Sequence, residues 1–250
     1  MVIFGKRIPM VFAILVWLVL WEVIGRLELL FLIPPFLDVV KALLNLFVTK
    51  KFYEALAISM QAFAVGVGLA VVIGIPLGVL MGRVKFVDRL IGMWVNVFVS
   101  APLTAIVPAL MVIVGFGQAT VVVTVVLFSV WIIALDTRAG VKGINPSLLE
   151  MTRSFGARNI EVYTKVIFWA ALPEILAGLR LGMIRGVRGV VVGQLLIAIM
   201  GIGELFELYS RNFLMDRFWA LVIFIFLFAY LVSELVNRLE HRVEFYAGTR

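Results

Sequence analysis

Long apolar runs dominate this 250-residue chain and restrict, more than any other feature, what it can fold into. Hydrophobic residues make up 64% of the sequence, charged residues only 15%, and the mean hydropathy is +1.15. Several runs of about twenty residues carry few or no charges, which is the length that crosses the hydrocarbon core of a membrane. Continuous apolar runs, rather than alternating ones, indicate helices and not the strands of a barrel. We therefore predict an all-α, polytopic membrane protein.

Six transmembrane helices are predicted from these runs. They are expected at about residues 8–25, 56–82, 87–115, 118–137, 172–200 and 217–237. Lys and Arg residues gather at the N-terminus, near 83–89, in 138–170 and after 237, and the positive-inside rule assigns such segments to the cytoplasm. Both termini are thus predicted to be cytoplasmic. The first run ends without a small-residue cleavage site, so we interpret it as an uncleaved span rather than a signal peptide.

The segment at 26–54 is the exception to this charge pattern, because it carries Lys and Arg residues but falls on the outer side. Within it, residues 38–47 have apolar side chains at helical spacing, and the Pro-Pro pair at 34–35 interrupts the helix pattern before them. We predict an amphipathic helix lying on the outer membrane interface. Neither a linker-like tract nor an internal repeat divides the sequence, so residues 1–250 are expected to form a single transmembrane domain.

A charged segment at about 142–171, set between two apolar spans, is the most distinctive part of the sequence. A connection between membrane helices needs only a few residues to turn around, and this one is much longer. Asn-Pro-Ser at 145–147 has the residue types that begin a helix, and Gly156 suits a tight turn between two short helices. The polar tip at 157–159 would then fit a groove in a partner protein. The alternative is an ordinary charged cytoplasmic loop.

The pattern of this segment resembles the EAA loop, the cytoplasmic helix-turn-helix through which permeases of ABC importers dock onto their ATPases. Glu150-Met-Thr is followed by Gly156, and Ala-Ala-Leu-Pro follows at 170–173. Further matches fall in the expected order along nearly the whole chain: Gly74-Ile-Pro-Leu-Gly78, Ala101-Pro102, Pro108, Thr137-Arg-Ala-Gly140, Gly178-Leu-Arg-Leu181, Gly189-Val-Val-Val-Gly193 and Gly201-Ile-Gly203. Together they resemble the permeases of the nitrate/aliphatic-sulfonate/taurine group.

This resemblance implies the type I ABC importer permease fold and a transmembrane permease subunit that moves a small, anionic solute into the cytoplasm by alternating access. It implies a prokaryotic plasma (inner) membrane location and four kinds of partner: a second copy of this permease in a homodimer, two ATP-binding-cassette ATPase subunits, a periplasmic or lipid-anchored solute-binding protein, and the lipid bilayer. ATP and Mg would be held by the ATPase, with no cofactor on this chain. The residues expected to couple to the ATPase are Glu150, Arg153, Gly156, Ala157, Arg158 and Asn159.

The sequence also departs from the family pattern. Met-Thr at 151–152 stands where Ala-Ala is usual, and Phe-Trp at 168–169 where Leu-Pro is usual, which are conservative changes for docking. Leu103 stands where a second Pro is common, and an acidic residue is frequent near Gln194. Because the last two positions lie where a solute would pass, the solute itself is not carried over from the family.

The fifth span holds a stripe of glycines and two mid-membrane arginines. The glycines recur at steps of four and three, so they share one helix face: Gly178, Gly182, Gly186, Gly189 and Gly193. We predict that this face packs closely against another helix, the alternative being a backbone-lined pathway. Arg185 and Arg188 lie about 18–22 Å along the span, where a charge costs about 2.5–3.5 kcal/mol. They are candidates for facing an anion; pairing with backbone carbonyls or snorkelling are the alternatives.

The candidates for lining the translocation pathway are Pro102, Pro108, Arg185, Arg188 and Gln194. Pro102 and Pro108 each remove a backbone hydrogen bond from the third span. They are expected either to break that span beside the pathway or simply to kink it.

Other functional classes fit the sequence less well. The chain has no G-x-x-x-x-G-K-[ST] phosphate loop, no Cys and a single His, so we expect neither ATP hydrolysis nor catalytic or metal-ligating residues. A stand-alone channel or secondary transporter is the alternative. It would need carboxylates or His in the middle of the spans to couple to ions, and this sequence lacks them there. The net charge is +7, but the Lys and Arg residues lie at the ends of apolar spans, so no nucleic-acid partner is expected. The solute stays open among nitrate, sulfonates, taurine, bicarbonate-like anions and vitamin precursors.

Overall fold

The structure, a computed structural model, describes residues 2–3, 6–7 and 10–247. Apart from two short strands, the regular elements of the described residues are helices, and the predicted all-α class is confirmed. In chain order the elements are β1 (Val2–Ile3), β2 (Lys6–Arg7), α1 (Met10–Arg26), α2 (Phe36–Leu46), α3 (Lys50–Arg83), α4 (Lys85–Ser100), η1 (Leu103–Ile106), α5 (Val107–Val114), α6 (Gln118–Lys142), α7 (Pro146–Ser154), α8 (Asn159–Glu161), the π-helical η2 (Val162–Ile167), α9 (Phe168–Ala170), α10 (Leu172–Ile197), α11 (Gly201–Arg211) and α12 (Met215–Ala247).

Each of the six expected spans coincides with a helix or a pair of helices. Of the described helices, α3, α6 and α12 are individually long and apolar enough to cross a membrane, and the number rises to five if each of two bent helix pairs counts as one span. The 17-residue α1 covers most of the first expected span. Helices therefore occupy all six expected positions; the third expected span is bent, and a second bend precedes the fifth, between α9 and α10.

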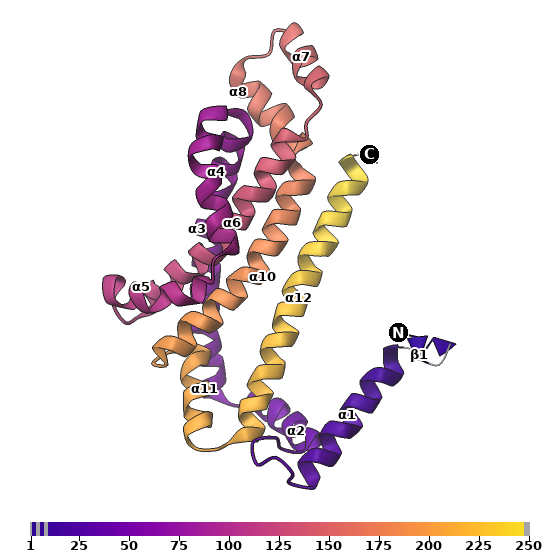
Figure 1. Cartoon of the computed structure of the whole chain (residues 1–250), viewed down its shortest axis with the longest axis vertical. Helices are drawn as coiled ribbons and strands as arrows, with labels where there is room; N and C mark the ends of the chain where they lie inside the picture. Colours follow the sequence, from indigo (N-terminus) through magenta and orange to yellow (C-terminus); the bar gives the residue numbers. More distant parts are fainter. Residues whose placement is uncertain (1, 4–5, 8–9, 248–250) are drawn as a thin grey trace.

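A bundle of α3, α6 and α10 forms the centre of the molecule, with α12 alongside α10 (Figure 1). Valine, isoleucine and alanine side chains fill its interior, among them Val67, Val125 and Ile133. Glycines let the helix axes approach: a Cβ at Gly66 would lie 2.6 Å from Val125. In a bilayer, where lipid tails are as apolar as leucine, such close packing is the main force holding helices together.

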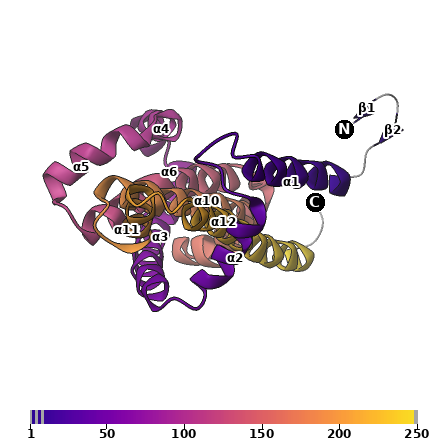
Figure 2. The same cartoon turned by 90° about the horizontal axis from the view of Figure 1, so that it is seen from below.

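The two ends of the bundle carry different elements. The segment α7–α8 lies at one end, toward which the C-terminal part of α12 also runs, whereas α2 and α11 lie at the opposite end (Figure 1). Helix α1 extends away from the bundle (Figure 2). It is held at its C-terminal end by Trp21, whose Nε1 donates to the Pro34 carbonyl at 3.0 Å and whose ring meets Trp219 edge-on at 5.4 Å.

The third expected span, residues 87–115, is not a continuous helix. It divides into α4 and α5, which meet at an angle of 96°. The break falls at Pro102, which has no N–H to continue the α4 hydrogen-bond ladder. Pro108 has a different effect, because it stands in the first turn of α5, where its missing N–H costs nothing.

Other boundaries also differ from expectation. The predicted amphipathic helix is present as α2, which buries Val39, Ala42 and Leu46. Helix α3 starts at Lys50 rather than near residue 56, because its first turns contain charged residues that precede the apolar run. Helix α11 lies between the fifth and sixth expected spans, where no helix was predicted.

Candidate coupling loop and translocation pathway

The loop after α6 begins with a capped helix. Asn145 Oδ1 accepts hydrogen bonds from the Ser147 backbone N–H at 3.0 Å and from its hydroxyl at 2.8 Å. Pro146 follows the cap, where its fixed φ favours the first helical turn. These contacts fix the direction in which α7 leaves the bundle, only three residues after α6 ends at Lys142.

Gly156 reverses the chain after α7. Its φ of +77° lies in the left-handed region, and a Cβ added there would meet no atom within 4 Å. The Gly156 N–H donates to the Arg153 carbonyl at 2.9 Å, which closes the turn. The turn therefore requires a residue that tolerates positive φ, rather than one that is small.

The second arm of the loop starts at Arg158. The Arg158 backbone N–H donates to Glu161 Oε2 at 3.0 Å, and Lys165 Nζ contacts Glu161 Oε1 at 2.9 Å. The Arg158 backbone N–H, together with Lys165, holds the pKa of the Glu161 carboxyl below its usual value. The chain continues through η2 and α9 and bends by 65° into α10.

A small hydrophobic cluster anchors the loop to the bundle. Its buried residues are Val141, Ile144, Val162, Ile167, Ala171 and Ile175. These residues come from α6, from both arms of the loop and from α10, so the loop and the ends of α6 and α10 share one packed core. The loop is therefore packed against the ends of both of these helices.

The exposed part of the loop combines charged and apolar side chains. Glu150, Arg153, Arg158 and Asn159 are exposed, as the docking prediction requires, while Ala157 is half-buried against the anchoring cluster. Sequence reasoning missed the apolar members: Met151 is 52%, Phe155 83% and Ile160 66% exposed. We call the set Glu150, Met151, Arg153, Phe155, Arg158, Asn159 and Ile160 the coupling surface. Large apolar side chains at such exposure typically mark a protein interface.

The structure places all five glycines of the α10 stripe on its buried face, against α6 and α3. A Cβ would lie 2.6 Å from Ile133 at Gly182, 2.9 Å from Val67 at Gly186 and 3.0 Å from the Val125 Cα at Gly189. At Gly182 the approach also brings the Ser129 hydroxyl 2.8 Å from the Gly182 carbonyl, to which it donates. This face of α10 is therefore covered by α6 and α3.

The two mid-membrane arginines have different surroundings. Arg185 is half-buried and lies close enough to Asp136 of α6 for their charges to attract. Arg188 is exposed and lines a groove of about 480 Å³ between α10, α11 and α12. The rest of that groove is apolar, with Phe206 and Phe218 among its walls. Arg188 is thus the more exposed of the two arginines, and its predicted contact with a solute stays a prediction.

Gln194 lies inside the bundle, 1% exposed. The Ser59 Oγ is 2.8 Å from Gln194 Oε1 and 3.0 Å from the Ala55 carbonyl, and it accepts the Ile202 N–H at 3.1 Å. One hydroxyl proton serves only one of the two acceptors. Turning the amide over lets Gln194 Nε2, which otherwise has no partner, donate to Ser59 while Ser59 donates to Ala55. We therefore assign Nε2 to the Ser59 side; the predicted pathway role of Gln194 stays a prediction.

Pro102 and Pro108 are both exposed, at the break between α4 and α5. They are therefore accessible at a point where the backbone changes direction. Helix α5, which carries Pro108, contacts α10, the helix that carries Arg188 and Gln194.

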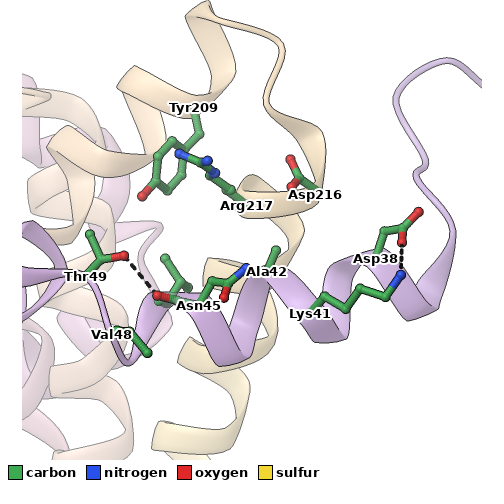
Figure 3. A pocket seen from close by; sticks show the side chains of 10 residues that line it. Asp38, Lys41, Ala42, Asn45, Val48, Thr49, Tyr209, Asp216 and Arg217 are labelled. Carbon is green, nitrogen blue, oxygen red and sulfur yellow. Dashed lines mark hydrogen bonds and ion pairs between the residues drawn. The ribbon is translucent and has the colours of Figure 1, made fainter.

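A further cavity opens at the end of the bundle opposite the loop (Figure 3). It has a volume of about 510 Å³ and lies between α2, α11 and α12. Figure 3 shows the Arg217 side chain beside Tyr209, with its guanidinium 6.0 Å from the ring centre. Lys41 and Asp38, 2.9 Å apart, form an exposed ion pair at its edge. Among the described residues, no group of three or more His, Asp or Glu side chains is placed to hold a metal ion.

Comparison with known proteins agrees with this arrangement. Residues 74–245 match the family described as binding-protein-dependent transport system inner membrane component. The chain is 27% identical over 235 residues to the taurine transport system permease protein TauC of Escherichia coli (strain K12), which covers 91% of this chain and 86% of that protein. It is 25% identical over 227 residues to the putative aliphatic sulfonates transport permease protein SsuC of Bacillus subtilis (strain 168), covering 90% and 82% of the two.

Among solved structures, an inward-facing form of the MetNI methionine ABC transporter superposes with a TM-score of 0.63, covering 80% of this chain and 95% of that one. At 23% sequence identity this likeness concerns the fold, which is that of type I ABC importer permeases. The family match covers more than half of the chain, and the relatives match it over most of their length. The chain belongs to the binding-protein-dependent transport system inner membrane components, and it is a multi-pass permease subunit of an ABC importer.

Proposed function

We propose that the coupling surface docks a separate ATP-binding-cassette ATPase, and that this chain moves a small anion into the cytoplasm. The exposed apolar side chains of Met151, Phe155 and Ile160 carry the docking half of this proposal. The loop that carries them has its own buried core, and these three side chains are not part of it. A groove on the ATPase would cover them and gain the free energy of burying apolar surface.

The proposed assembly contains two copies of this chain as a homodimer, two ATPase subunits and a periplasmic or lipid-anchored solute-binding protein. Residues 1–250 act as a single transmembrane domain, with residues 142–171 as its cytoplasmic coupling loop. Both termini then lie in the cytoplasm, and α12 running toward the loop end of the bundle supports this for the C-terminus (Figure 1). ATP and Mg are bound by the ATPase, so this chain is not an enzyme and holds no cofactor.

Arg188 supports an anionic solute. Its guanidinium lies on an apolar wall in the outer half of α10, where a fixed positive charge attracts an anion strongly because little water screens it. A planar guanidinium also matches the oxygens of a sulfonate or carboxylate in a two-point contact. Taurine and short aliphatic sulfonates, named for two relatives, are the first solutes to test.

Reconstitution tests the proposed function. The chain is co-expressed with the ATPase and the binding protein that we expect its neighbouring reading frames to encode, purified, and placed in proteoliposomes. We expect the ATPase to co-purify, ATP hydrolysis to rise with the loaded binding protein, and labelled taurine or an aliphatic sulfonate to accumulate only with ATP. Uptake without ATP would instead favour a channel or a secondary transporter.

A further inference from the structure

A cluster of three charged side chains joins α4 to the cytoplasmic end of α6. Arg138 Nε lies 2.5 Å from Asp88 Oδ1, and Lys142 Nζ donates to Asp88 Oδ2, also at 2.5 Å. The Asp88 side chain is 17% exposed and that of Arg138 24%, so the centre of the cluster is largely shielded from water. Each carboxylate oxygen of Asp88 therefore has its own cationic partner.

A second contact fastens the other end of α4. The rings of Phe98 and Trp131 stack with their centres 4.6 Å apart and their planes within 6°. Pairing residue 88 with 138 and 142, and residue 98 with 131, is the register of two antiparallel helices. Between the two contacts α4 buries only Gly92 and Val95, while large side chains such as Leu90 and Trp94 are exposed. The Asp88 cluster and the Phe98–Trp131 stack are thus the main fastenings between α4 and α6.

The two fastened helices lead to different functional parts of the chain. Helix α6 ends at Lys142 and passes through three residues into α7 of the coupling loop. Helix α4 ends at Ser100 and passes into the break at Pro102. The cluster therefore connects, through two rigid helices, the surface proposed to dock the ATPase with the broken span.

We propose that Asp88, through Arg138 and Lys142, is a positioning residue that transmits movement of the coupling loop to the broken span at Pro102. The inference rests on the proposed docking of an ATPase to the loop and adds the route by which that docking acts. Asp88 does not touch the solute or the ATPase in this scheme. Its role is to make α4 follow α6 when the loop is displaced.

Electrostatics makes Asp88 the critical member of the three. Arg138 and Lys142 are four residues apart on one face of α6, so their like charges repel each other. Removing the Asp88 charge leaves both cations without compensation in a partly desolvated place, which is far more disruptive than losing a pair exposed to water. We therefore expect α4 to detach from α6 at its cytoplasmic end when Asp88 is neutralised.

A labelling experiment tests this link without knowledge of the solute. The chain has no Cys, so Thr104→Cys introduces a single thiol at an exposed position of η1, just beyond the break. The full complex with its ATPase is treated with a charged methanethiosulfonate reagent, with and without ATP plus vanadate. We expect ATP and vanadate to change the labelling rate on the order of tenfold, in line with typical coupling energies. With Asp88→Asn, that change should fall below about twofold while the ATPase still co-purifies and hydrolyses ATP.

Three further variants and a control sharpen the result. Asp88→Lys places three positive charges together and should abolish the change in labelling rate. Adding Lys142→Asp to that variant again gives one carboxylate between two cationic side chains, and it should recover the change. Lys142→Met, at a position 45% exposed, should reduce the response partially because Arg138 remains. Glu234→Gln removes a carboxylate that pairs with Arg238 at 2.8 Å on the surface of α12, and it should leave the response unchanged.

The outcomes separate this inference from the proposed function. An unchanged response in Asp88→Asn, a wild-type complex whose labelling ignores nucleotide, or failure of the charge exchange to recover the response would each overturn the inference alone. If the Asp88 and Lys142 variants instead lose assembly with the ATPase, the cluster is structural and the inference is also wrong. Absence of the ATPase from the purified wild-type complex would contradict the proposed function itself, and this inference would fail with it.

Discussion

At Gly156 the backbone takes a φ of +77°, while a side chain placed there would meet no atom within 4 Å. The obstacle to substitution is thus the backbone conformation and not the available space. Asparagine visits the left-handed region readily, whereas a β-branched residue there is strained. This difference allows the conformation of the turn to be tested separately from the size of the side chain.

We predict that Gly156→Val destabilises the turn by at least about 1–2 kcal/mol and disrupts the coupling surface, while Gly156→Asn retains it. Both variants should insert into the membrane normally, because the anchoring cluster is unchanged. The measurement is recovery of the ATPase with affinity-purified permease. Equal recovery with valine and asparagine would show that the left-handed turn does not matter for docking.

Gln194 is a residue whose surroundings the sequence did not reveal. Its amide, Ser59 and the Ile202 N–H form a buried network where α3, α10 and α11 meet, and a Cβ at Gly201 would lie only 2.3 Å from the Gln194 side-chain amide. The partners are 135 residues apart in sequence, so no local pattern links them. Long-range polar pairs of this kind become visible only once the helices are packed.

Gln194→Leu should lower the stability of the complex by about 1–3 kcal/mol, because it removes a buried hydrogen bond and introduces a branched side chain against Gly201. Gln61→Leu is the matched control, since Gln61 makes its 3.2 Å contact to Gln118 on the exposed surface. Thermal unfolding in detergent, followed by size-exclusion chromatography, distinguishes the two. A similar melting temperature for both variants would contradict the buried network.

At the scale of helices, hydropathy predicts where spans occur but not how they bend. The apolar runs located a helix at each of the six expected positions, and the helical spacing of 38–47 predicted α2, because both signals are local. The 96° break at Pro102 was foreseen only as one of two outcomes, since a proline in a span kinks or breaks it according to what its neighbours can satisfy. Helix α11 was missed because Glu204, Glu207 and Arg211 make its sequence resemble a polar loop.

The glycine face of α10 provides a prediction at this scale. Gly189→Leu would force a side chain into space where the Cβ alone lies 3.0 Å from the Val125 Cα, and backbone cannot move aside as a flexible side chain can. Overpacking of this kind costs about 1–3 kcal/mol. The matched control is Gly68→Leu on α3, where a Cβ meets nothing within 4 Å. We expect only the Gly189 variant to elute as dissociated or aggregated protein after mild heating; unchanged elution of both would mean that α10 does not need this close contact.

Across the whole molecule, charged residues distinguish the two ends of the bundle, and two arginines lie between them on α10. The basic segments at 83–89 and 138–170 lie at the loop end, and the acidic residues of α11 lie at the opposite end (Figure 1). By the positive-inside rule the loop end is expected to be cytoplasmic. The sequence identified Arg185 and Arg188 as a pair of candidates but gave no reason to separate them. Their surroundings differ only in the folded bundle, where Asp136 from α6 approaches Arg185 and an apolar groove surrounds Arg188.

Replacing the two arginines should therefore have different consequences. If Arg188 binds the passing anion, Arg188→Lys keeps the charge but loses the planar two-point contact, and Arg188→Met loses both. Uptake of labelled taurine or an aliphatic sulfonate should fall in the order Arg, Lys, Met, with at least about tenfold loss for Met, while assembly with the ATPase persists. Arg185→Met should instead weaken the assembly itself, because it leaves Asp136 without its cationic neighbour. Full uptake by Arg188→Met, measured at substrate concentrations below saturation, would rule out a contact between Arg188 and the sulfonate group of the solute.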